Sequence, residues 1–140
     1  MILPYLKLKC QELLLFLDMT GPAETKPLDP YYSGQIEIIR RIHAQLTEDL
    51  TRRYTIDELS RQYRINTSAL KSIFKSVYGM PVASYMKRYR ILRAAEMLRD
   101  GSSNISEAAH AVGYESQSKF SSAFRDIMDV LPTEYRKQHG

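Results

Sequence analysis

The sequence of 140 residues is poor in the features that mark disulfide frameworks, metal sites and membrane proteins. Its single cysteine, Cys10, can form no internal disulfide, and the 3 histidines are not spaced as metal ligands. No apolar run approaches the ~18 residues of a membrane helix, and no early basic cluster opens a signal peptide. We therefore expect no metal and no membrane association, and a location in the reducing cytoplasm.

Signatures of catalysis are also missing. The sequence shows no Cys/His pair, no paired carboxylates in a glycine-framed pocket and no glycine-rich phosphate loop. No segment reads convincingly as a strand, whereas several carry the 3-4 spacing of amphipathic helices. The sequence therefore predicts an all-α fold with no catalytic residues and no cofactor, and an enzyme is the least favoured class.

Basic residues are present in excess, and they are concentrated in one part of the chain. The net charge is +4, but residues 35–99 hold 13 Lys and Arg against 6 Asp and Glu. Residues 1–34 and 100–140 each hold more acidic than basic side chains. A basic field of this kind suits a polyanion, although a solvated charged surface would have the same composition.

The N-terminal third of the chain combines an apolar helix with a proline-rich linker. Residues 3–19 carry leucines at coiled-coil spacing with further apolar residues on other faces, so this predicted helix needs a covering partner. Residues 20–33 read as a linker, and residues 35–51 as an amphipathic helix with His43 on its apolar side. We interpret His43 as a packed histidine rather than a ligand.

A first helix-turn-helix unit follows. Thr55 and Glu58 have the spacing of a capping box that opens a helix ending near Tyr63. A second helix over residues 67–78 is predicted to end at Gly79. A joining helix is predicted over residues 82–98, with its apolar positions at Tyr85, Met86, Tyr89, Leu92, Ala95 and Met97.

A second unit mirrors the first. Asn104 or Ser103 is expected to cap a helix over residues 105–112, and Ser116 a helix over residues 117–128. A last helical turn is predicted from Pro132 through Tyr135. The predicted organisation is an N-terminal helix and linker in residues 1–34, a first unit with the joining helix in 35–100, and a second unit in 101–140.

The two units are copies of one pattern. Leu70, Phe74 and Tyr85 recur at an offset of 50 as Phe120, Phe124 and Tyr135. A repeat of this length is typical of a duplicated supersecondary unit. Leu70, Ile73, Phe74 and Val77 form the expected buried stripe of the helix over residues 67–78, and Phe120, Ala123, Phe124 and Ile127 that of the helix over 117–128.

The segment 113–125, GYESQSKFSSAFR, followed by 132–136, PTEYR, closely resembles the C-terminal signature of AraC/XylS-type transcription regulators. In the first unit Phe74, Gly79, Tyr85, Arg90 and Ala94 also fall where that family places them. The resemblance covers about residues 36–138. It departs from the pattern at Tyr114, at Leu131 and at Asp126, which stands where a basic residue is common. Together with the acidic surplus after residue 99, these changes weaken the electrostatics of the second unit.

The resemblance implies a DNA-binding domain whose two units insert one helix each into successive major grooves. The base-reading positions that it implies are Ser68, Lys71, Ser72, Gln117, Ser118, Lys119 and Ser122. Candidate phosphate contacts are Asn66, Thr67, Lys75, Arg53, Arg64, Lys87, Arg88, Ser116, Ser121 and Arg125. Arg90 also matches a family position, but its neighbours on the joining helix favour a packing or salt-bridge role at least as strongly.

The expected partners are double-stranded DNA and RNA polymerase, the latter because an activator must contact it. A homodimer through residues 3–19 is a further expectation. The family usually carries a sensing domain ahead of the DNA-binding part, so a small-molecule effector is expected only through such a domain. A helical protein-interaction module without DNA binding remains the alternative to a nucleoid-associated regulator.

Overall fold

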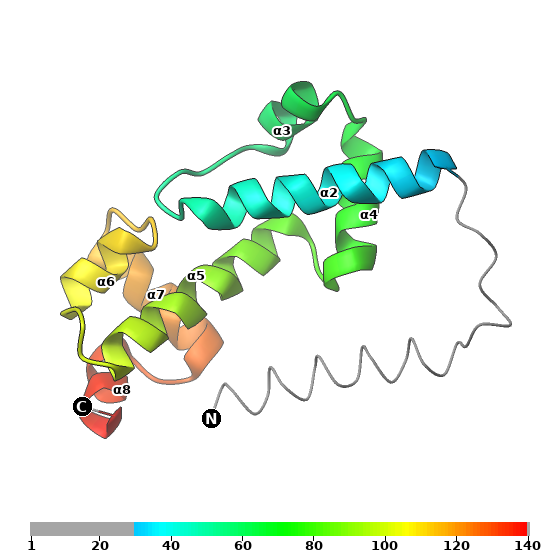
Figure 1. The fold of residues 1–140 in the computed structure, drawn as a ribbon. Coiled ribbons are helices and arrows are strands. Elements are labelled where there is room, and N and C mark those ends of the chain that lie inside the picture. Colours follow the sequence, from blue (N-terminus) through cyan, green and yellow to red (C-terminus); the bar gives the residue numbers. More distant parts are fainter. Residues whose placement is uncertain (1–29, 140) are drawn as a thin grey trace, which may run out of the picture. The chain divides into compact units, whose positions relative to one another are not determined.

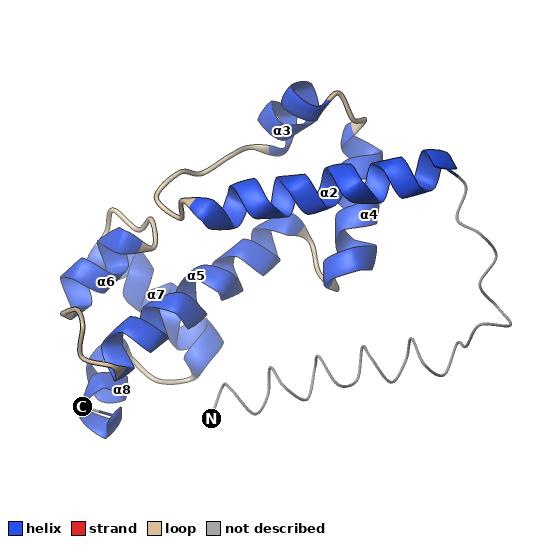
Figure 2. Ribbon diagram, in the orientation of Figure 1, coloured by secondary structure: helices blue, strands red, loops and turns tan. Residues whose placement is uncertain are grey.

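The structure is a computed structural model that describes residues 30–139, and its chain divides into two units, Met1–Gly34 and Gln35–Gly140. Within the described residues every element is a helix, and short loops join the helices (Figure 2). The predicted all-α fold is therefore confirmed for this part of the chain. The helix predicted over residues 3–19, and the dimer contact assigned to it, lie outside the described residues.

The helices agree closely with the sequence pattern in the two repeated units and less closely at the ends. The described helices are α2 (Pro30–Glu48), α3 (Ile56–Tyr63), α4 (Thr67–Tyr78), α5 (Val82–Arg99), α6 (Ile105–Ala111), α7 (Gln117–Met128) and α8 (Pro132–His139) (Figure 1). The predicted linker is too long at its end, because α2 begins at Pro30, whose ring presets the φ of a first helical position. The last helix continues beyond the predicted turn to His139.

Side-chain caps define where the short helices begin. The Thr55 hydroxyl accepts a hydrogen bond of 3.1 Å from the Glu58 N–H and so caps α3. Asn104, rather than Ser103, caps α6 in a reciprocal capping box with Glu107, with bonds of 2.8 and 3.1 Å. Each cap satisfies N–H groups that have no partner inside the helix.

The first core lies between α2, α3, α4 and the start of α5. Its fully buried members come from three helices: Ile39 and Ile42, Leu59, and Leu70 and Phe74. The long helix α2 forms one side of this core, and the helix-turn-helix of α3 and α4 packs against it (Figure 1).

His43 packs among aromatic rings at the edge of the first core. Its ring stacks on Tyr78 at 4.3 Å between centroids, and its Nε2 lies 2.7 Å from the Tyr85 hydroxyl oxygen. Burial lowers the pKa of His43. Burial, with smaller contributions from the neighbouring Tyr78 and Tyr89, raises the pKa of Tyr85 to about 12.

The joining helix α5 is buried on more than one side, which the sequence pattern did not indicate. It contacts α4 of the first unit and α6, α7 and α8 of the second. Ile91, Ala94 and Leu98 are fully buried, whereas Leu92 and Met97, two of the predicted apolar positions, are only partly buried. A helix that packs against two cores has no single apolar stripe, so its most buried residues coincide only in part with the predicted apolar positions.

Four residues with a left-handed backbone conformation follow helices at matching places in the two units. Arg64 (φ 53°) follows α3 and Gly113 (φ 88°) stands in the matching turn after α6. Gly79 (φ 85°) ends α4 and Asp129 (φ 64°) ends α7. The backbone conformation is therefore repeated, although glycine occupies only one member of each pair.

Candidate nucleic-acid interface

One side of α4 is polar and open to solvent. Ser68, Lys71, Ser72 and Lys75 are all exposed, while Leu70, Ile73 and Phe74 on the opposite side are buried. The four exposed residues also line a depression of about 480 Å³ beside Pro81 and Val82. This face combines two amines with two hydroxyls on a helix whose other face is fixed in the core.

The N-terminus of α4 is ordered by its own cap. The Asn66 side-chain oxygen accepts a bond of 2.8 Å from the Ser68 N–H, and Thr67 is the first helical residue. The remaining N–H groups of the first turn carry the positive end of the helix dipole. Asn66 therefore positions this helix end, and the oxygen that bonds Ser68 is already occupied.

The outward face of α7 carries two cations, as that of α4 does, and adds an amide and an acidic residue, Asp126. Gln117, Ser118, Lys119, Ser122 and Arg125 are exposed, and Ser121 is partly buried. On the inner side, Phe120, Ala123 and Phe124 are buried. The Ser116 hydroxyl accepts a bond of 3.3 Å from the Lys119 N–H and caps the helix.

Two residues predicted to bind phosphate, Arg53 and Lys87, make contacts within the protein. Arg53 donates two bonds to the carbonyl oxygen of Gly113, of 3.1 and 3.0 Å from Nε and Nη2. Lys87 on α5 forms a salt bridge of 2.9 Å with Asp126 on α7. The acidic residue at position 126 thus has a structural partner.

Other predicted phosphate contacts lie at the surface in different settings. Arg64 is exposed and is the left-handed residue in the turn before α4. Arg88 is partly buried on α5. The predicted residues therefore come from α4 and α7, from the turns that precede these two helices, from the loop between α2 and α3 and from α5.

Arg90 is the buried cation that sequence reasoning could not assign. Its side chain donates bonds of 3.3 Å to the carbonyl oxygens of Leu50 and Arg52, and the residue is only 4% exposed. Burial, and next the charge of Arg53, lower the pKa of Arg90, while Tyr114 acts in the opposite direction. Arg90 thus has a packing role with two backbone partners.

Residues 30–139 contain no group of three His, Cys, Asp or Glu side chains arranged to hold a metal ion. Within the same residues, no helix combines the length and the apolar character that crossing a membrane requires.

Comparisons with known proteins agree on one family. A family model described as "Helix-turn-helix domain" matches residues 59–138, which is more than half of the chain. The chain is 36% identical over 109 residues to a putative AraC-like transcription regulator from Streptomyces antibioticus, covering 78% of this chain and 34% of that protein. It is 28% identical over 127 residues to the transcriptional activator RhaR from Mannheimia succiniciproducens, covering 91% of this chain and 44% of that protein.

The chain thus spans less than half the length of either relative. Its fold is similar to that of the DNA-binding domain of AdpA, a global transcriptional factor solved in complex with a target DNA. That likeness has a TM-score of 0.66 at 20% identity and covers 71% of this chain and 90% of the AdpA chain.

Proposed function

Because this chain belongs to the AraC-type family of helix-turn-helix proteins, we propose that it binds double-stranded DNA in a sequence-specific way and regulates transcription. The observation that carries the proposal is the pair of capped helices, α4 and α7, each with one buried face and one exposed polar face. The major groove of B-DNA admits an α-helix, and polar side chains on its outer face reach the base edges.

In the first unit, Lys71 is the principal base-reading residue that we propose. An exposed lysine amine suits the O6 and N7 acceptors of guanine. Ser68 and Ser72 lie on the same exposed face and are short enough to reach bases through water or to bond a phosphate. Lys75, one turn further along α4, is assigned to the phosphate backbone.

In the second unit, Gln117 is the residue best suited to a specific base. Its carboxamide can pair with the N6 and N7 atoms of adenine. Ser118, Lys119 and Ser122 share the exposed face of α7 and complete the proposed reading set. Arg125 and Ser121 lie nearer the C-terminal end of the helix, and we assign them to phosphates.

Backbone N–H groups at the starts of α4 and α7 would add phosphate contacts. Asn66 and Ser116 cap these ends with their side-chain oxygens and leave first-turn N–H groups available, with Thr67 beside the first of them. Helix N-termini attract anions through these groups and the helix dipole. Exposed Arg64 and partly buried Arg88 supply further positive charge near the first unit.

The length of α5 supports binding to two successive grooves. Its 18 residues give an axis of roughly 27 Å at 1.5 Å per residue. With the half-width of each unit added, the reading helices come close to the ~34 Å repeat of B-DNA. A single chain would then cover two boxes about one helical turn apart.

Selection of bound sequences from a random DNA pool tests this proposal. We expect enrichment of a bipartite site whose two boxes are centred about one helical turn apart. A variant with Lys71→Ala and Gln117→Ala should lose the enrichment and still fold. A pool without enrichment for the natural protein would refute specific binding.

The alternative, a helical protein-interaction module without DNA binding, rests on the helical surfaces alone. A titration with salt separates the two functions, because ~6–10 phosphate contacts produce a steep loss of DNA affinity as salt rises. The excess of basic residues between 35 and 99 favours the DNA-binding protein. A flat salt response with weak binding would favour the alternative.

We further propose that the protein is an activator acting on chromosomal DNA in the cytoplasm, since the similar RhaR protein is named an activator. RNA polymerase would be its second partner. A homodimer through residues 3–19 stays a prediction. Light scattering on residues 1–140 and 35–140 tests it, and identical monomer masses would argue against pairing.

A further inference from the structure

We propose that Arg53 and Gly113 form a clasp between the two helix-turn-helix units, and that this clasp sets which spacing of DNA boxes the chain accepts. Arg53 is thereby a positioning residue rather than a phosphate contact. The inference rests on the proposed function for its DNA readout, but the clasp itself is a feature of the protein alone.

The contact joins two loops that are 60 residues apart in sequence. Arg53 lies between α2 and α3, and Gly113 lies in the turn between α6 and α7. Two donors of one guanidinium converge on one carbonyl oxygen, at 3.1 and 3.0 Å. Such a paired, charge-assisted contact fixes direction as well as distance.

The same guanidinium also rests on the residue that leads into the second reading helix. Its Cζ lies 4.9 Å from the centre of the Tyr114 ring. That ring packs edge-on against Phe120, a fully buried residue of α7, at 5.7 Å. Arg53 of the first unit is therefore connected through one aromatic ring to the buried face of α7.

Gly113 allows the two units to touch through their backbones. A Cβ atom at this position would lie 2.2 Å from the Leu50 carbonyl oxygen and 3.4 Å from the Thr51 Cα. By contrast, a Cβ atom at Gly79, which has nearly the same φ, would meet nothing within 4 Å. Gly113 is thus required for close approach as well as for its left-handed conformation.

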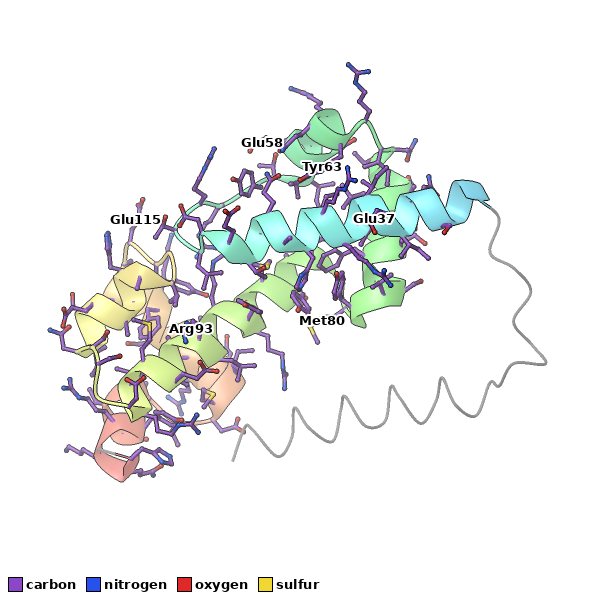
Figure 3. All side chains as sticks on the ribbon, viewed as in Figure 1. Glu37, Glu58, Tyr63, Met80, Arg93 and Glu115 are labelled. Carbon is purple, nitrogen blue, oxygen red and sulfur yellow. The ribbon has the colours of Figure 1, made fainter. Side chains whose placement is uncertain are left out.

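Arg90 holds the other side of the same loop. From α5 it donates to the carbonyl oxygens of Leu50 and Arg52, so the loop that carries Arg53 is itself anchored to the joining helix. A path of contacts then runs from α5 through the loop to the turn before α7. Figure 3 labels Glu115 in that turn, where it lines one depression together with Thr51 and Arg53.

The clasp matters because a helix alone is an incomplete spacer. Helices curve, and a bend or twist of α5 would rotate one reading helix relative to the other. A second attachment beside the helix axis resists both motions. One base pair changes the direction of a groove by about 35°, so a rigid pair of reading helices must discriminate sharply between spacings.

The test measures affinity for DNA with the two boxes separated by the preferred spacer and by spacers one to three base pairs longer or shorter. We expect Arg53→Lys to weaken binding at the preferred spacer by roughly 3- to 10-fold, because the binding-competent orientation becomes a fraction of the population. We also expect its spacer profile to flatten. Affinity for a single box should stay unchanged, because each unit is intact.

Arg53→Lys separates the clasp from a phosphate contact, since lysine keeps the charge and loses the paired donors. Arg52→Ala is the matched control: its neighbouring guanidinium lies over Tyr54 of its own unit, at 4.9 Å, and its loss should leave the spacer profile unchanged. If affinity depended on spacer length in Arg53→Lys as it does in the natural protein, the clasp would be overturned. A second result would also overturn it: Arg53→Ala loses as much affinity for a single box as for the two-box site, and the slope of log affinity against log salt concentration becomes shallower by about 1.

A measurement without DNA keeps the clasp testable if the proposed function fails. Spin labels at exposed Arg61 on α3 and exposed Gln138 on α8 report the separation of the units in the free protein. We expect a narrow distance distribution that broadens in Arg53→Lys and stays narrow in Arg52→Ala. Equal widths in all three proteins would contradict the clasp, whatever the DNA results.

Discussion

The two helix-turn-helix units share a buried frame, which is Leu70, Phe74 and Tyr85 in the first unit and Phe120, Phe124 and Tyr135 in the second. They differ in most of the contacts around this frame. Phe74 meets Tyr85 and Phe124 meets Tyr135, in both cases edge-on with ring centroids 5.5 Å apart. The first frame is backed by the long helix α2, and the second by α5, which also closes the first. One helix therefore packs against both copies of the pattern, which belong to one compact unit, Gln35–Gly140.

The polar partners of the frame were not duplicated. The Tyr85 hydroxyl has the His43 ring as a partner, whereas the Tyr135 hydroxyl is buried without a hydrogen-bond partner among the described residues. The outward faces differ too: each carries two cations, but only α7 adds an amide, Gln117, and an acidic residue, Asp126. The shared frame specifies geometry, while the differences are where affinity and sequence preference can arise.

The largest expected effect compares two glycines that have nearly the same φ. Gly113→Ala should lower the free energy of unfolding by about 2–4 kcal/mol, because a clash with the Leu50 carbonyl adds to the left-handed strain. Gly79→Ala should cost only about 1 kcal/mol of strain. Urea denaturation measures both. Equal losses would mean that the turn at Gly113 moves away from Leu50 without cost.

The second prediction compares the two reading helices. Lys71→Ala should reduce DNA affinity by about 1–3 kcal/mol, and Lys119→Ala by less, because the basic charge is concentrated on the first unit. A mobility shift at fixed salt measures both. An equal or larger loss from Lys119→Ala would contradict the idea that the first unit dominates affinity.

The third prediction compares the two equivalent tyrosines. Tyr85→Phe should destabilise the fold by about 1 kcal/mol, because it leaves the His43 ring nitrogen without its partner. Tyr135→Phe should be neutral or slightly stabilising, since it removes a buried hydroxyl with no partner in the described structure. Thermal denaturation of both variants tests the difference. A larger loss from Tyr135→Phe would show that this hydroxyl has a partner, such as water.

The smallest expected effect is a pH dependence found in the first unit. Burial lowers the pKa of His43, so below about pH 6.5 the unfolded chain takes up a proton that the folded chain resists. Stability should therefore fall as pH drops from 7.5 to 5.5, and the slope should be shallower in His43→Gln. His110→Gln, at an exposed position of the second unit, is the control. An unchanged slope in His43→Gln would exclude this histidine as the cause.

The sequence predicted the repeated elements well, because their signals are local. The ranges of α4 and α7, the caps at Thr55 and Ser116, and the buried stripes through Phe74 and Phe124 follow from helical spacing and capping chemistry. The start of α2 at Pro30 was missed, because proline favours both a linker and a first helical turn.

The positions of side chains between elements could not be predicted in the same way. Arg53 was expected to contact phosphate as an exposed arginine in a basic stretch, and its bonds to Gly113 depend on a loop 60 residues away. Lys87 and Asp126 are 39 residues apart and pair only because α5 and α7 pack together. Which residues of α5 are buried depends on the two cores that pack against it, one from each unit.

By itself, the sequence determined the helices, the duplicated frame and the polar faces of α4 and α7, since spacing, caps and the αL positions act over a few residues. Only the tertiary structure decided that Gly113 must approach Leu50, that Arg90 anchors the loop and that Arg53 joins the two units. Those contacts join segments that are distant in sequence, so they form and stabilise the fold only after both cores have packed against α5.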